Sequence, residues 1–314
     1  MDQGLSPAGF PRCVLITGAS GLVGRALLHR LSQHQPRTEI RLLGRSARGI
    51  REWEGIPVQG FGWNPADGAL DAAALDGVDC IVHLAGETVA QRWSPAVKGR
   101  IRDSRIAALG IIEKACRSGN MAPRLVSASA IGWYPSADRL QRESDPVGSG
   151  FIAEVVRDWE AAAASLGTLG GGHVALRTGL VLAAGGGVLG KLVPLYRLGL
   201  GSPLSPGTQW QSWIHIDDLV SLFLASMEQR QWDGAFNAVS PAPIRQQGFS
   251  RSLAEALGRP HMLPSVPQWA IRLLYGEAAH ALLASHRILP ARTLAAGFEF
   301  QHQNLDDALQ DILR

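Results

Sequence analysis

Three glycines near the start of the chain have a spacing that suits phosphate binding. Gly18, Gly21 and Gly24 follow the apolar run Cys13–Thr17 and open a segment with helical periodicity. In a strand–turn–helix unit, Gly18 permits the sharp turn, Gly21 lets a phosphate approach the backbone, and Gly24 lets helix and strand pack closely. The free N–H groups of the helix start would face the anion. An ordinary corner needs one glycine, so three in register predict a dinucleotide site.

The residue at the end of the next expected strand selects the dinucleotide. An NAD site has an acid there, about 20 residues beyond the glycine turn, which binds the ribose hydroxyls. This chain has Arg45 at that position, and Glu39 stands at the opposite end of the strand. An arginine can pair with the 2′-phosphate that distinguishes NADP from NAD. We therefore expect NADP(H) as the cofactor, the alternative for Arg45 being a solvated surface side chain.

Candidate groups for proton transfer or carbonyl binding follow the later strands. Ser127 and Ser129 close an apolar run and could hold a substrate carbonyl, or could bond to the backbone as strand-end serines do. Tyr134 could act as an acid, but without a neighbouring cation its pKa stays near ~10, too high for a base at neutral pH. Glu87, just past another apolar run, could be a base or could cap the next turn.

Aromatic and histidine side chains supply candidate substrate contacts. Trp93 and Trp213 are expected to flank the cleft, where flat rings stack on a sugar or a base, although tryptophans often simply pack. His215 and Asp217 resemble a His–carboxylate pair, but their spacing favours anchoring of a helix N-terminus. The three cysteines show no metal-ligand spacing, so we expect reduced packing thiols and no metal site.

The composition is typical of a globular protein with a substantial core. The 314 residues are 46% hydrophobic and 18% charged, with a net charge of +3. The arginines are scattered, which argues against a nucleic-acid surface. No apolar run reaches the ~18 residues of a membrane span, and the N-terminus lacks the apolar segment of a signal peptide. We expect a cytoplasmic protein, a monomer or a homodimer, with a small-molecule substrate and without nucleic-acid or membrane partners.

Strand and helix patterns alternate along the first half, which predicts βαβ units and a parallel sheet. The expected strands are 13–17, 39–45, 56–61, 80–86, 125–129 and 173–178. One helix is expected to follow the glycine turn. A second begins after Ser94-Pro95 and ends near Gly119, and a third covers 151–166 and stops at Gly167.

The second half is less regular. Residues 185–187 predict a flexible glycine loop, and 194–213, rich in Gly, Pro and Ser, predict a site-forming loop. The expected helices are 219–228, 246–257, 269–285 and 305–313, and the expected short strands are 236–239 and 298–300. We therefore predict an α/β fold with a Rossmann-type, doubly wound parallel sheet. Its NADP-binding domain covers residues 1–178, with sheet elements also from 213–240, and a smaller, mostly helical substrate-side lobe covers 179–314.

Four motifs bear on the protein's family. They are Gly18-x-x-Gly21-x-x-Gly24, His83-Leu84-Ala85-Gly86-Glu87, Ser127-Ala128-Ser129-Ala130-Ile131-Gly132 and Trp213-Ile214-His215-Ile216-Asp217-Asp218-Leu219. Together they resemble the extended short-chain dehydrogenase/reductases, and more narrowly their atypical epimerase-like family within the NAD(P)-dependent epimerase/dehydratase superfamily. The resemblance covers nearly the whole chain, including a small C-terminal module of unknown role at about 260–310. It implies a seven-stranded Rossmann-type domain that holds NADP, with substrate between that domain and the C-terminal lobe.

The resemblance also implies, position by position, which residues contact the cofactor. The pyrophosphate would lie against Gly18, Ser20, Gly21, Leu22 and Val23, the adenosine end against Arg45 and Ser46, the ribose against Leu84, Ala85 and Gly86, and the nicotinamide side against Ser127 and Arg177-Thr178.

The catalytic pair of that superfamily is missing from this chain. Its usual catalysts are a Ser and a Tyr-x-x-x-Lys, in which the lysine lowers the pKa of the tyrosine. The expected place reads Phe151-Ile152-Ala153-Glu154-Val155, and none of the three tyrosines has a lysine four residues later. Two functions follow. One is an NADP(H)-dependent oxidoreductase or epimerase for a small carbonyl or nucleotide sugar, with Ser129 and Tyr134 as catalytic candidates. The other is a non-catalytic NADP(H)-binding sensor or partner-binding protein.

Overall fold

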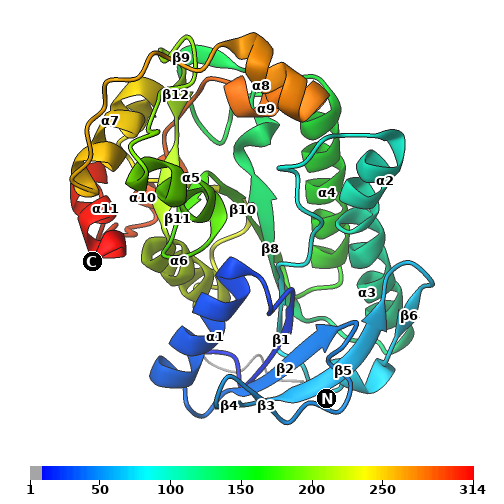
Figure 1. Cartoon of the computed structure of the whole chain (residues 1–314). Helices are drawn as coiled ribbons and strands as arrows, with labels where there is room; N and C mark the ends of the chain where they lie inside the picture. The colour runs from blue at the N-terminus through cyan, green and yellow to red at the C-terminus, as the bar shows by residue number, and fades with distance from the viewer. Residues whose placement is uncertain (1–8) are drawn as a thin grey trace.

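The chain folds around a central, mostly parallel β-sheet. The computed structural model describes residues 9–314 (Figure 1). Across the sheet the strands run in the order β14, β10, β8, β7, β1, β2, β5, β6. In that order their bounds are Gly234–Ala238, His173–Thr178, Arg124–Ala130, Cys80–His83, Cys13–Thr17, Glu39–Gly44, Gln59–Asn64 and Ala69–Leu70. Neighbours pair in parallel, except for β5 and β6, which form an antiparallel hairpin.

Helices cover both faces of the sheet because its strands are apolar on both faces. In β1, alternate side chains enter two different cores. Val14 packs in the core formed with α1 (Leu22–His34) and α6 (Ile216–Glu228). Leu15 packs on the other face, with α3 (Ile106–Ser118) and α4 (Phe151–Gly167). The Rossmann-type, doubly wound α/β fold that the sequence predicts is confirmed.

The strand order locates the crevice in which a ligand would bind. From β1 the chain continues outward to β2 and β5, and it then returns to the other side of β1 to form β7, β8, β10 and β14. The order therefore reverses between β1 and β7. In open α/β sheets, ligands bind at the carboxyl ends of the strands beside such a reversal.

The helix expected after Ser94-Pro95 is divided in two. Ser94 caps α2 (Pro95–Asp103) by accepting a hydrogen bond from the Val97 N–H. The chain turns at Ser104 before α3 begins. At this turn the Arg105 guanidinium donates to the carbonyl of Ile101, at 2.9 Å, and so replaces a backbone partner that a continuous helix would supply.

The second half also differs from the expected pattern. Residues Gly187–Arg197 form helix α5 where the sequence predicts parts of two loops. The helix is stabilised because it buries Leu189 and Tyr196, while Pro194 within it is exposed. The expected strand at 298–300 is absent, since those residues pair with no strand among residues 9–314.

The C-terminal residues pass close to β9 and end beside α7 (Figure 1). Strand β16 (His286–Ile288) pairs in parallel with β9 (Ala137–Gln141). Helix α11 (Leu305–Leu313) packs against α7 (Gln246–Ala256) in a shared apolar core. The remaining C-terminal elements are α8 (Gln268–Tyr275), η3 (Gly276–Ala278), α9 (Ala279–Leu283) and α10 (Ala291–Ala295), so the single helix expected at 269–285 is broken.

Short elements complete the described chain. Three further two-stranded pairs are β11 (Leu180–Leu182) with β13 (Trp213–His215), β12 (Trp210–Gln211) with β15 (Ile244–Arg245), and β3 (Glu52–Trp53) with β4 (Ile56–Pro57). Two 3₁₀ helices are η1 (Ala72–Leu75) and η2 (Ile131–Trp133). Among residues 9–314, no helix has both the length and the apolar character that crossing a bilayer requires.

Candidate cofactor and substrate site

The glycine turn between β1 and α1 is packed directly on backbone. Gly18 has φ +73°, and a Cβ atom there would lie 2.6 Å from the carbonyl carbon of Leu84. A Cβ atom at Gly24 would lie 2.4 Å from the carbonyl oxygen of Gly18. Both positions therefore need glycine, for the turn and for the close helix–strand packing that the sequence predicts. Gly21 stands at the N-cap of α1 without a side-chain cap, so the first N–H groups of the helix are available to an anion.

A buried hydroxyl connects the end of β1 to the segment after β7. The Thr17 Oγ1 atom accepts hydrogen bonds from the N–H groups of Leu84 and Ala85, both at 3.2 Å. It also lies 2.9 Å from Nδ1 of His83. Burial lowers the pKa of His83 to about 3, so the ring is neutral. Because the hydroxyl oxygen already accepts two N–H groups, it donates its own proton to Nδ1. Thr17 thus fixes the backbone that faces Gly18.

Three strand ends gather the residues that the resemblance assigns to the cofactor. Arg45 and Ser46 are exposed immediately after β2, Ser20 is exposed in the turn after β1, and residues 84–86 follow β7. Because β2, β1 and β7 are parallel neighbours, these ends meet at one edge of the sheet. The arrangement can accommodate an extended dinucleotide with its diphosphate at the α1 N-terminus.

A second glycine segment, at 185–187, also reaches this edge. A Cβ atom at Gly186 would lie 2.6 Å from Cδ1 of Leu22, the first residue of α1. The segment therefore packs onto the start of α1 and leads into α5. The sequence predicts a flexible loop here. A run of glycines does not reveal that the segment packs on a side chain far away in the sequence.

Arg177 lies at the centre of a buried polar network. Its Nε and Nη2 atoms donate to the two carboxylate oxygens of Glu160, each at 2.8 Å. Its Nη1 donates to the Tyr134 hydroxyl at 3.0 Å and to the Glu143 carbonyl at 3.2 Å. The guanidinium carbon lies 3.9 Å from the centre of the Trp133 ring. These contacts engage the guanidinium on all its sides, which favours a structural role over the expected cofactor contact.

The two catalytic candidates belong to the same network. The Ser129 hydroxyl donates to Glu160 at 2.6 Å, and the Tyr134 hydroxyl donates to Oδ1 of Asn237 at 2.6 Å. Tyr134 is only 2% exposed, and burial raises its pKa to about 12. Ser127 is fully buried and donates to the carbonyl of Ala128 at 2.8 Å. These contacts favour positioning of the strand ends over proton transfer to a substrate.

The match to known sequences agrees with this architecture. The family model described as "NAD dependent epimerase/dehydratase family" matches residues 14–238, more than half of the chain. The chain belongs to this family. A second model, described as a domain of unknown function (DUF1731), matches residues 266–312. It overlaps the C-terminal module that the resemblance places at about 260–310.

Relatives of similar length carry the same family name. The epimerase family protein Mb2239 of Mycobacterium bovis is 37% identical over 301 residues, covering 94% of this chain and 96% of the relative. The chloroplastic SDR39U1 homolog of Arabidopsis thaliana is 35% identical, covering 96% of this chain and 86% of the relative. The crystal structure of human epimerase family protein SDR39U1 with NADPH is 29% identical, with a TM-score of 0.82, covering 96% of this chain and 98% of that chain.

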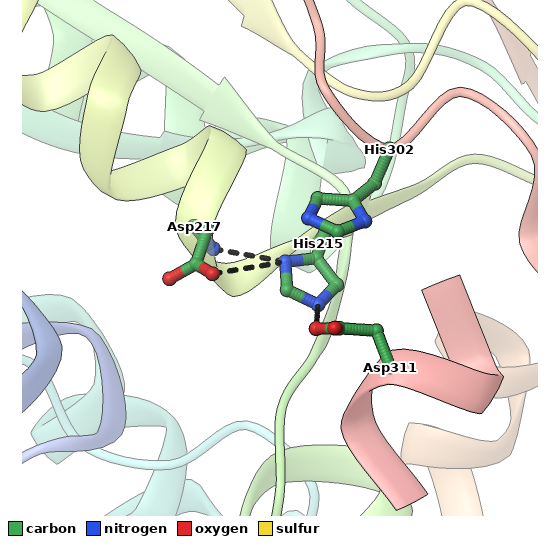
Figure 2. A group of neighbouring side chains, drawn as sticks. All are labelled: His215, Asp217, His302 and Asp311. Carbon is green, nitrogen blue, oxygen red and sulfur yellow. Dashed lines mark hydrogen bonds and ion pairs between the residues drawn. The ribbon is translucent and has the colours of Figure 1, made fainter. Parts of the chain in front are cut away.

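The structure corrects two of the expected substrate contacts. Trp213 is fully buried, and its indole N–H donates to the carbonyl of Ala242 at 3.0 Å, so it belongs to the core. His215 is 2% exposed and caps α6, where it accepts a hydrogen bond from the Asp217 N–H at 3.1 Å. Its neighbours are His302 and Asp311 of the C-terminal region (Figure 2). Both side chains face the interior, and for His215 this agrees with the helix-anchoring alternative that its spacing favours.

Glu87 and Trp93 lie in the segment between β7 and α2. The Glu87 carboxylate accepts a hydrogen bond from the side chain of Gln91, four residues later, at 3.0 Å. This contact joins two side chains, and capping of the next turn would instead require a backbone N–H donor. Trp93 packs edge-on against Phe151, with ring centres 5.1 Å apart. It therefore contacts the position at which the resemblance expects the catalytic tyrosine.

Lys98 is a candidate that the sequence analysis missed. Its ammonium lies 5.1 Å from the centre of the Phe151 ring and 2.6 Å from Oε2 of Glu277. Lys98 belongs to α2 and Glu277 to η3, so residues 179 positions apart meet beside Phe151. No local spacing connects Lys98 to Phe151, and only the folded chain brings a cation to this position.

Proposed function

We propose that the chain binds NADP(H) and acts as an oxidoreductase or epimerase on a small carbonyl or nucleotide-sugar substrate, without the tyrosine–lysine pair. The observation that carries the cofactor assignment is the exposed Arg45 at the carboxyl end of β2, where an NAD site has an acid. The glycine turn supports a diphosphate beside it. The human relative crystallised with NADPH supports the same choice.

The experiment compares NADPH and NADH affinities by fluorescence titration for the wild type and the Arg45→Ala variant. The 2′-phosphate loses its charge-assisted partner, so NADPH binding is expected to weaken about tenfold, equivalent to about 1.4 kcal/mol, while NADH binding changes little. Arg48→Ala, an exposed arginine three residues later, is the matched control and is expected to leave both affinities unchanged. Equal NADPH preference in wild type and Arg45→Ala would remove the basis of the assignment.

Lys98 is the side chain we infer to assist the chemistry. When NADPH is bound, the cofactor supplies the hydride that a carbonyl carbon accepts. An ammonium beside Phe151 can donate a hydrogen bond to the carbonyl oxygen and a proton to the resulting alkoxide. Tyr134, with its raised pKa and buried hydroxyl, is less suited to that step.

A screen of carbonyls and nucleotide sugars for NADPH oxidation or product exchange tests for turnover. With an active substrate, Lys98→Met is expected to lower kcat at least tenfold while Lys114→Met, which changes an exposed lysine of α3, does not.

The absence of a tyrosine–lysine pair favours a second candidate function, an NADP(H)-binding sensor or partner-binding protein. Tight NADPH binding with no turnover across a broad panel would support that candidate and contradict the enzyme.

A further inference from the structure

Four side chains from distant parts of the sequence converge between α6 and α11. His215 precedes α6 and Asp217 lies in its first turn, whereas His302 precedes α11 and Asp311 lies near its end (Figure 2). Each offers one ligand atom, and these four atoms lie within 4.8 Å of one another. Neither the cofactor edge nor the Phe151 region uses this cluster.

One imidazole nitrogen in the cluster is buried without a hydrogen-bond partner. His215 is 2% exposed, and its Nε2 atom makes no hydrogen bond to the described residues. Nε2 lies 3.4 Å from Oδ2 of Asp311, without the alignment of a hydrogen bond (Figure 2). A tetrahedral zinc ion with bonds of about 2.0–2.1 Å separates its ligand atoms by about 3.3–3.4 Å. This pair therefore already has the separation of two ligands on one ion.

The second imidazole is held beside the first. The rings of His215 and His302 stack with centres 3.7 Å apart and planes 23° apart. Because the lone pairs lie in the ring planes, the partly buried His302 ring must turn about its side-chain bonds to share an ion with His215. Asp218 fixes the backbone of His302, because its carboxylate accepts the Gln301 N–H at 2.8 Å and the His302 N–H at 3.0 Å. Hence the backbone of His302 is fixed beside His215, while Nε2 of His215 is without a hydrogen-bond partner among the described residues.

Asp217 is placed to orient His215. Its Oδ1 atom pairs with Arg30 of α1 at 3.2 Å, and its Oδ2 atom lies 3.9 Å from Nδ1 of His215. A carboxylate on the second ring nitrogen of a metal-bound histidine fixes the ring and its tautomer. In the cluster as it stands, Nδ1 accepts the Asp217 N–H, so the ring proton is on Nε2.

We propose that His215, His302 and Asp311 bind a divalent zinc ion, with Asp217 orienting the His215 ring. Two imidazoles and a carboxylate are a zinc ligand set, and water completes the tetrahedron. Binding moves the ring proton of His215 from Nε2 to Nδ1. Nδ1 then donates a hydrogen bond to the Asp217 carboxylate and no longer accepts one from the Asp217 N–H. Burial and then the neighbouring His302 lower the pKa of His215, which favours the neutral imidazole that a metal ion binds.

The site would join the C-terminal helix to the Rossmann core. Its ligands come from the start of α6, the segment before α11, and α11 itself. The sequence predicts no metal site, because these residues span 215–311 without a recognisable spacing. This inference is independent of the proposed function. The cluster contacts α1 through Arg30, which pairs with Asp217. Arg30 lies eight residues, about 12 Å, along α1 from Leu22, the residue at the expected diphosphate end.

Zinc titration of the full chain tests the site. The wild type, stripped with a chelator, is expected to bind one equivalent of Zn²⁺ by isothermal titration calorimetry and to unfold at a higher temperature with Zn²⁺ than with Mg²⁺. Asp311→Asn and His302→Ala are each expected to weaken Zn²⁺ binding at least tenfold and to remove the thermal shift. Bound Co²⁺ is expected to show the visible absorption of a four-coordinate ion.

Matched controls separate the cluster from other surface groups. Asp307→Asn changes an exposed carboxylate of the same helix, and His280→Ala changes an exposed histidine elsewhere; both are expected to bind Zn²⁺ as the wild type does. If the variants unfold cooperatively without metal, they are folded, and their loss of Zn²⁺ binding is then due to the changed ligand. No Zn²⁺ binding by the wild type, or binding that Asp311→Asn and His302→Ala leave unchanged, would overturn the proposal. NADPH affinity is expected to be unaffected by these variants.

Discussion

Thr17 and His83 set the conformation of the cofactor edge through one hydrogen-bonded pair. Burial keeps the His83 ring neutral in the folded chain, with its pKa lowered to about 3. In the unfolded chain the ring titrates near ~6.5. Between those values the unfolded state binds more protons, so stability falls as pH falls, and above ~6.5 the group contributes no pH dependence. His286, whose pKa burial lowers to about 4, acts in the same direction.

We therefore expect the free energy of unfolding of the wild type, measured by urea denaturation, to fall between pH 7 and pH 5 by roughly 1 kcal/mol per pH unit for each of these rings. In His83→Asn the amide oxygen can still accept the Thr17 hydroxyl, but the titrating group is gone. The stability of the His83→Asn variant is therefore expected to fall less steeply than that of the wild type between pH 7 and pH 5. Parallel pH profiles for the two proteins would show that His83 is not a source of the dependence.

Replacing Tyr134 tests whether its hydroxyl stabilises the fold or takes part in catalysis. In Tyr134→Phe, the Oδ1 atom of Asn237 and one Arg177 N–H lose their partner. A buried polar group without a partner costs about 1–3 kcal/mol, so the free energy of unfolding in urea is expected to fall by that amount. NADPH affinity is expected to stay the same. Tyr275→Phe, at the end of α8, is the control for loss of a hydroxyl. A loss of turnover without a loss of stability would instead support Tyr134 as an acid.

At the scale of elements, Arg124 joins the start of β8 to the end of α6. The side chain is 1% exposed, and its guanidinium donates to the carbonyls of Ser226, Gln229 and Trp232 at 2.7–3.0 Å. A cation at a helix C-terminus satisfies carbonyls that have no helical partner and opposes the helix dipole. The contact fixes the direction in which the chain leaves α6 toward β14.

Arg124→Met is expected to lower the free energy of unfolding by about 3 kcal/mol, because it leaves several buried carbonyls without donors. Arg117→Met removes an arginine that is 54% exposed and paired on the surface with Glu113. It is expected to change stability by less than about 1 kcal/mol. Chemical denaturation of both variants measures the difference, and equal effects would contradict the assigned role of Arg124.

At the scale of the molecule, the C-terminal module is interlaced with the sheet domain. Its strand β16 pairs with β9, and α10 lies beside β14, where Thr293 donates to the Asn237 carbonyl at 2.9 Å. Arg292 lies over the Phe236 ring at 4.2 Å. The β16–β9 pair joins the module to the first half, and the α10 contacts join it to β14, the strand that the second half adds beside β10.

We therefore predict a single cooperative unfolding transition for the whole chain. Tryptophan fluorescence reports residues of both halves, including Trp63 and Trp213, and far-ultraviolet circular dichroism reports the helices. Their urea transitions are expected to coincide, because neither half keeps its buried contacts without the other. Two separated transitions would indicate that residues 1–178 fold as an independent domain.

The sequence by itself determined the features that depend on near neighbours. The glycine turn, the apolar strand runs and most helices could be predicted, because hydrophobic period and turn chemistry act over a few residues. The place of Arg45 at a strand end and the absence of a lysine four residues after any tyrosine are likewise local facts. Those patterns predicted the fold and pointed to the type of cofactor.

Only the tertiary structure decided what surrounds each polar side chain. The partners of Arg177, the burial of Tyr134, the meeting of Lys98 with Glu277 and the cluster around His215 all join segments far apart in the chain. A side chain's pKa, accessibility and hydrogen bonds depend on whatever packs against it in three dimensions. The chemistry expected of Ser129, Tyr134 and His215 from sequence alone therefore changed once their neighbours were known.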